Sequence, residues 1–153
     1  DPIVVDKLVQ SRGIKVVCGG TTSQIVSSHT GEQLTVTLNY ENPGIPPAAH
    51  IKGIDLVTEG VLTIGKTLDM LKRFPYMDRS EKVIALSKKD AASRLVRILL
   101  EESTEVRFLV GRAINPAHQN PEMPISLGLK LNLIKEMKAE KKKIGKIVNI
   151  EYF

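Results

Sequence analysis

Aromatic residues are scarce in this sequence: they make up 4% of the 153 residues, and tryptophan is absent. Proteins that bind single-stranded nucleic acid use aromatic side chains as stacking platforms. The net charge of +5 would by itself favour such a partner, but much of the excess lies in residues 138–146, KAEKKKIGK. We interpret this run as the solvated end of a helix, where cations complement the helix dipole, and expect no nucleic-acid partner.

Cysteine occurs once, at Cys18, so the chain cannot form an internal disulfide. The three scattered histidines offer no zinc-type spacing. Because Cys18 ends an apolar run, we expect a small buried thiol rather than a reactive one. No apolar run approaches the roughly 20 residues that span a bilayer. The first residues, DPIVVDKLVQ, lack the features of a signal peptide. We therefore expect no membrane partner and a cytoplasmic location.

Strand and helix signals alternate along the chain. Apolar runs or alternation predict strands at residues 15–18, 34–40, 54–57, 106–110 and 146–152. Helical spacing predicts helices before Gly13, before Gly31, and over residues 62–74, 90–102 and 127–143, whereas residues 75–89 are left open. This order predicts one α/β domain over residues 1–153, a three-layer sandwich around a mainly parallel or mixed sheet of about five strands.

Polar residues follow three of the predicted strands. In open α/β sheets, ligands bind beyond the carboxyl ends of the strands, so these residues are candidate ligand groups. The first set includes two glycines, which allow close approach of the backbone, at a helix start whose amides can hold a phosphate or carboxylate. The candidates are Gly19, Gly20, Thr21, Thr22 and Ser23 after the first strand, Thr58 and Glu59 after another, and Arg112, Asn115 and His118 after a third.

Each candidate also has a purely structural interpretation. Thr22 or Ser23 would act as a simple helix cap, and Glu59 would lie near a helix start. Arg112 would pair with a surface carboxylate, and His118 would be a turn residue. GGTT matches neither of the glycine-rich phosphate-binding motifs. Ser23 does not lie in a nucleophile-elbow sequence, so no catalytic residue is assigned.

Three segments, KVVCGGTTSQIV, HIKGIDLVTEGVLT and FLVGRAINPAHQNPEMPI, together resemble the region that follows the phosphatase domain in bacterial Ser/Thr phosphatases similar to stage II sporulation protein E. The resemblance implies a carboxyl-terminal accessory domain of a longer, type 2C-like phosphatase chain, with the catalytic domain in cis. The catalytic part of that family binds Mn²⁺ or Mg²⁺ through aspartates. Nothing here matches those aspartates, so no cofactor is expected in this chain.

A weaker likeness links the glycine- and hydroxyl-rich loop to phosphosugar isomerase and sugar-sensor folds, in which such a loop holds a phosphate. Our leading hypothesis is a regulatory module that binds an anionic, phosphate-bearing small molecule. One alternative is a protein-interaction or dimerisation module without a small ligand, for which Ile45, Met123, Pro124 and Ile125 are candidate contacts. A small enzyme acting on a phosphorylated metabolite is a third possibility.

Overall fold

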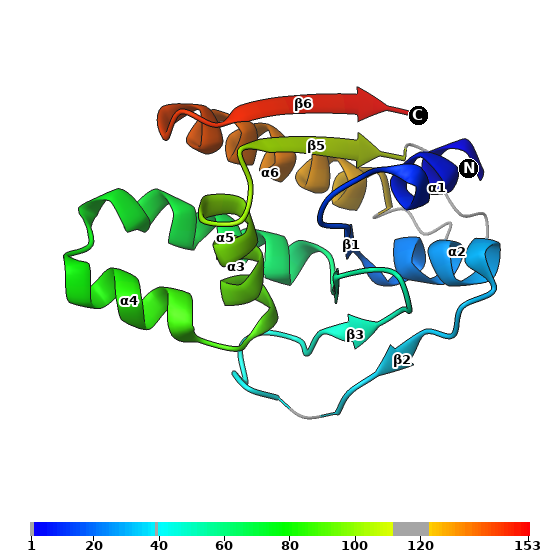
Figure 1. Ribbon diagram of the computed structural model, residues 1–153, viewed down its shortest axis with the longest axis horizontal. Coiled ribbons are helices and arrows are strands. Elements are labelled where there is room, and N and C mark those ends of the chain that lie inside the picture. Colours follow the sequence, from blue (N-terminus) through cyan, green and yellow to red (C-terminus); the bar gives the residue numbers. More distant parts are fainter. Residues whose placement is uncertain (1, 39, 112–122) are drawn as a thin grey trace.

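Helices and short strands alternate along the part of the chain that the computed structural model describes (Figure 1), which is residues 2–38, 40–111 and 123–153, with side chains of the last segment from residue 128. The order is α1 (Pro2–Gln10), β1 (Val16–Cys18), α2 (Gly20–Thr30), β2 (Thr35–Val36), β3 (Ala49–His50), β4 (Leu56–Thr58), α3 (Val61–Arg73), η1 (Phe74–Tyr76), α4 (Arg79–Ser87), α5 (Ala91–Leu100), β5 (Glu105–Val110), α6 (Met123–Lys143) and β6 (Ile147–Tyr152). The fold is therefore mixed α/β.

The strands form two separate sheets among the described residues. One sheet has the order β1-β4-β3-β2, in which only β1 and β4 are parallel, and the other is the parallel pair β5-β6. The sequence predicted one mainly parallel or mixed sheet of about five strands; the four-stranded sheet is mixed, but the described strands do not form a single five-stranded sheet. A parallel neighbour requires a crossover connection, usually a helix. The described residues between Gly31 and Leu56 contain no helix, and β2, β3 and β4 pair in antiparallel fashion.

The predicted strand over residues 34–40 is much shorter in the structure, because only Thr35–Val36 pairs with a neighbour. Leu38 is 90% exposed, and Tyr40 is also exposed. The alternation of apolar and polar residues is real, but no element among the described residues buries Val36, Leu38 or Tyr40. The prediction was wrong about the length of this strand.

Capping residues set boundaries of α2, α4 and α5. Gly31 ends α2 in the left-handed region at φ 74°, and its N–H donates to the carbonyl of Ser27. The Asp90 carboxylate accepts the Ser93 N–H at 2.9 Å and so starts α5. Residues 75–89, which had no assignment from the sequence, include the end of η1 and all of α4. Asp78 caps α4, because its side chain accepts the Glu81 N–H.

The parallel pair β1-β4 has helices packed against both of its faces. Val17 and Val57 pack with Val5 of α1 and Val26 of α2 in one apolar cluster. On the opposite face, Leu56 belongs to a larger cluster with residues of α3, α5 and α6, namely Ile64, Leu68, Leu71, Leu95, Val96, Leu99 and Met137. The carboxyl ends of β1 and β4 are thereby held between two packed layers. None of the described helices is both long and apolar enough to cross a membrane.

The lysine-rich end of α6 is not wholly solvated, contrary to the sequence interpretation. Lys141 is fully buried, and its ammonium donates to the Leu99 carbonyl and to Ser103 Oγ. It thus satisfies a backbone acceptor at the carboxyl end of α5, where a cation is also favoured by the helix dipole. Burial, followed by the nearby charge of Lys146, lowers the pKa of Lys141 from 10.5 to about 8.

This buried lysine predicts a rise in stability in mild alkali. Between pH 8 and 10.5 the unfolded chain keeps the Lys141 proton and the folded chain has released it, so the free energy of unfolding increases with pH. We expect the Lys141→Met variant to lack this contribution, whereas Lys142→Met, at an exposed position, retains it. Urea unfolding of the three proteins at several pH values measures the difference. Parallel pH profiles for wild type and Lys141→Met would contradict the assignment.

Candidate functional site

The junction between β1 and α2 is made by Gly19, whose φ of 113° and ψ of 139° suit only glycine. Its N–H donates to the Thr58 carbonyl at 2.8 Å, which joins the exits of β1 and β4. The first bond of α2 runs from the Ser23 N–H to the Gly19 carbonyl, so the N–H groups of Gly20, Thr21 and Thr22 precede it and have no partner within the helix. These three residues are exposed.

Thr22 and Ser23 do not cap α2, contrary to the structural interpretation of these residues. Among the described residues, the N-cap position of α2 is Gly19, which makes no side-chain capping hydrogen bond. Ser23 is buried, and its Oγ donates to the Gly20 carbonyl at 2.8 Å. Ser23 therefore stabilises the first turn, whereas Thr21 and Thr22 stay accessible beside the amides.

The second predicted set lies next to the first, because Cys18 and Thr58 are paired in the β1-β4 register. Thr58 is buried, and its Oγ1 donates to the Glu59 carbonyl. The Glu59 carboxylate accepts the N–H groups of Leu62 and Thr63 at 3.1 and 3.3 Å. Glu59 thus satisfies the start of α3, in agreement with its structural interpretation.

Lys130 of α6 reaches both strand exits, although it was not among the residues predicted from the sequence. A methyl group on Gly19 would lie 3.4 Å from Lys130 Nζ and 3.5 Å from Thr22 Oγ1, and one on Gly60 would lie 3.3 Å from the same Nζ. The two glycines therefore leave room for the lysine side chain. Lys130 is half-buried, and the described residues provide no hydrogen-bond or ion-pair acceptor for its ammonium.

A helical pattern could have indicated Lys130. Counting along α6, Lys130 shares a stripe with Leu133, Met137 and Lys141, and this stripe faces the core. A lysine at the start of a buried stripe points inward. In the sequence this pattern was obscured by the neighbouring run of lysines.

Cys18 lies beside this group and is a thiol at neutral pH. Burial raises its pKa above 9.0, and the hydrogen bond with Thr58 and the charge of Lys130 oppose that rise. The raised pKa agrees with the expectation of an unreactive cysteine, although Cys18 is only partly buried.

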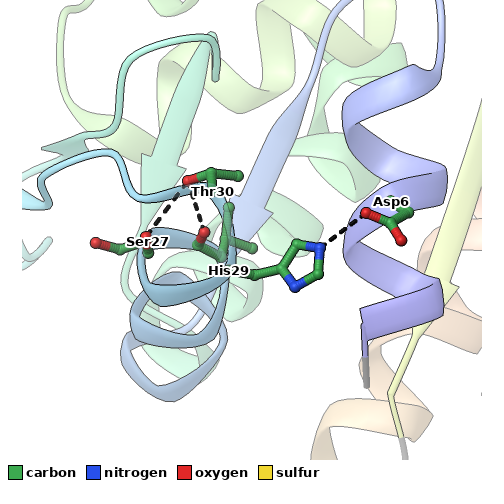
Figure 2. A network of polar contacts seen from close by, with 5 residues as sticks. Asp6, Ser27, His29 and Thr30 are labelled. Carbon is green, nitrogen blue, oxygen red and sulfur yellow. Dashed lines mark hydrogen bonds and ion pairs between the residues drawn. The ribbon is translucent and has the colours of Figure 1, made fainter.

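Figure 2 shows how α2 is fixed against α1. His29 Nε2 lies 2.8 Å from Asp6 Oδ1, and Thr30 Oγ1 donates to the Val26 carbonyl and more weakly to that of Ser27. A shallow groove runs between the two helices and includes Thr21 and Ile25 in its lining. The contact between His29 and Asp6, together with the packing of Val26 with Val5, thus holds α2 against α1.

The third predicted set, Arg112, Asn115 and His118, lies outside the described residues. The structure therefore brings together the first two sets and adds Lys130. Among the described residues, no group of three or more His, Cys, Asp or Glu side chains could hold a metal ion.

No family model matches this chain. Comparisons with curated proteins and with solved structures gave no match either.

Proposed function

We propose that this chain is a regulatory module that binds an anionic, phosphate-bearing small molecule at the exits of β1 and β4. The observation that carries the proposal is the half-buried ammonium of Lys130, which lies beside Gly19 and Gly60 without an acceptor among the described residues. It adds a positive charge to the exposed amides at the start of α2, which attract anions through the helix dipole.

Two hydroxyl groups and one carboxylate complete the proposed site. Thr21 and Thr22 are exposed and can donate to phosphate oxygens. Glu59 carries the opposite charge, but its carboxylate is bonded to the amides of α3, which stabilise that charge locally. We expect the phosphate to contact the α2 side of the site and Lys130.

We further propose that the module belongs to a longer phosphatase chain, on the strength of the three sequence segments that resemble the region after the catalytic domain. Ligand binding would alter the activity of that domain in cis only if the ligand prefers one domain arrangement over another. The resemblance supports the assignment of the module to a phosphatase chain, and the geometry of the strand exits supports an anionic ligand.

Thermal unfolding tests the site directly. A ligand at 100 times its dissociation constant adds about 2.7 kcal/mol of stability, which raises the melting temperature of a domain of this size by about 5–10 °C. We expect such a rise from at least one member of a panel of inorganic phosphate, sugar phosphates and nucleotides. We also expect that Lys130→Met weakens binding about tenfold, because a charged hydrogen bond is lost.

Two variants make this test specific. Thr22→Glu places a negative charge beside the amides and is expected to abolish the rise, whereas Lys135→Met, at an exposed position on the same helix as Lys130, is expected to preserve it. A panel without any thermal shift, or equal shifts in wild type and Lys130→Met, would count against the proposal.

A protein-interaction module remains the second candidate, and one observation favours it. Val36 and Leu38 are strongly exposed at the edge strand β2 and just after it. Ile45 does not contribute, contrary to the sequence expectation, because it is buried against Ala91 and Ala92. The side chains of Met123, Pro124 and Ile125 lie outside those described. A mass that increases with concentration and returns to the monomer value in Leu38→Lys would identify homo-oligomerisation through this edge.

A further inference from the structure

A cavity of about 140 Å³ lies away from the strand exits, between the segment that includes β3 and the start of α5. Its apolar wall is formed by Ile45, Pro46 and Pro47, and its polar lining includes Glu41, Lys89 and Arg94. Neither the proposed phosphate site nor any core contact described above uses these charged groups.

The apolar wall is fixed by local contacts. Ile45 is buried against Ala91 and Ala92 at the start of α5. The Ile45 N–H donates to the Asn42 carbonyl at 3.1 Å, and Asn42 Oδ1 accepts the Gly44 N–H at 2.9 Å. Because the two prolines that follow have no N–H, this wall offers a ligand apolar surface and carbonyl oxygens but no backbone donor of its own.

The charges around the cavity balance, which favours a ligand with both signs of charge. Lys89 and Arg94 are positive, Glu41 and Asp90 are negative, and His50 lies exposed at the rim. Asp90 is already bonded to Ser93 through both carboxylate oxygens, at 2.9 and 2.8 Å. The half-buried guanidinium of Arg94 has no acceptor among the described residues and can take a carboxylate in two parallel hydrogen bonds.

The volume limits the size of the ligand. An enclosed apolar cavity of about 150 Å³ holds one benzene molecule, so this pocket, which opens to solvent, surrounds roughly six to eight non-hydrogen atoms of a ligand. We infer that it binds a free α-amino acid with a small apolar side chain. The carboxylate contacts Arg94 and Lys89, the ammonium faces Glu41, and the side chain packs on the proline wall.

Titration of the ¹⁵N-labelled 153-residue chain with L-valine, monitored by amide chemical shifts, tests this inference. We expect saturable shifts confined to residues 37–50 and 89–94. Two matched probes separate the charges: isovalerate is valine without its ammonium, and isobutylamine is valine without its carboxylate. Each is expected to bind about tenfold more weakly, since each loses a charged hydrogen bond.

Variants provide the second part of the test. Arg94→Met is expected to weaken valine binding about tenfold, and Glu41→Gln to weaken it while leaving isovalerate binding unchanged. Lys88→Met, which alters an exposed lysine outside the lining, should bind valine as wild type does. The inference is overturned if alanine, valine and proline all leave these amides unshifted, if isovalerate binds as tightly as valine, or if Arg94→Met binds normally.

Discussion

Replacing Gly19 by alanine is expected to destabilise the domain by about 1–3 kcal/mol, because alanine at φ 113° is strained wherever the neighbours lie. The strain acts at the residue whose N–H bonds Thr58 and whose carbonyl accepts the first hydrogen bond of α2. Relief of the strain would displace the start of α2 relative to β4. We therefore expect Gly19→Ala to weaken phosphate binding as well, measured by denaturant unfolding and by calorimetric titration.

The neighbouring glycine provides a matched control. Gly20 lies in the first turn of α2 without positive φ, and nothing lies within 4 Å of a methyl group added there. Gly20→Ala should leave stability unchanged or raise it by up to about 1 kcal/mol, because alanine loses less entropy on entering a helix. Equal destabilisation by the two substitutions would contradict the backbone geometry assigned to this junction.

Leu56→Ala is expected to have the largest effect on stability, about 2–5 kcal/mol. Leu56 is 2% exposed and lies in the cluster that joins β4 to α3, α5 and α6. The loss combines the transfer energy of the removed carbons with the cavity left between layers that cannot fully collapse. Urea unfolding monitored by circular dichroism measures it.

Leu38→Ala is the corresponding control, with an expected change within about 0.5 kcal/mol because Leu38 is 90% exposed. The alternation of apolar and polar residues predicts that Leu38 faces inward from a strand, whereas the structure exposes it. Comparing Leu38→Ala with Leu56→Ala therefore also distinguishes the structure from the sequence-based prediction. A loss above about 2 kcal/mol at Leu38 would mean that residues 34–40 form a buried strand after all.

Local signals in the sequence predicted most of the helices but left α4 unassigned. Gly31 lacks a side chain and adopts the left-handed conformation that ends α2, and the Asp90 carboxylate caps the start of α5. The spacing of apolar residues indicates which face of α3 and of α5 is buried. The structure also confirms that GGTT lies at a strand-to-helix junction, between β1 and the first turn of α2. That the junction binds an anion stays a prediction.

Features that depend on distant parts of the chain were not predictable. Whether β5 joins β1 or forms a separate sheet with β6 depends on packing, and the sequence contains no pattern that distinguishes the two. Lys130 approaches Gly19 and Gly60 only because α3 and α6 pack in one cluster. Lys141 is buried by the same packing, although its neighbours Lys142 and Lys143 are exposed.

The most direct test of the phosphate site is the amide spectrum of ¹⁵N-labelled protein during titration with inorganic phosphate. We predict that the N–H resonances of Gly20, Thr21 and Thr22 move most in the wild type, and that these shifts largely disappear in Lys130→Met. Unmoved amides at the start of α2, or shifts concentrated at the exposed Lys142 and Lys143, would contradict the account.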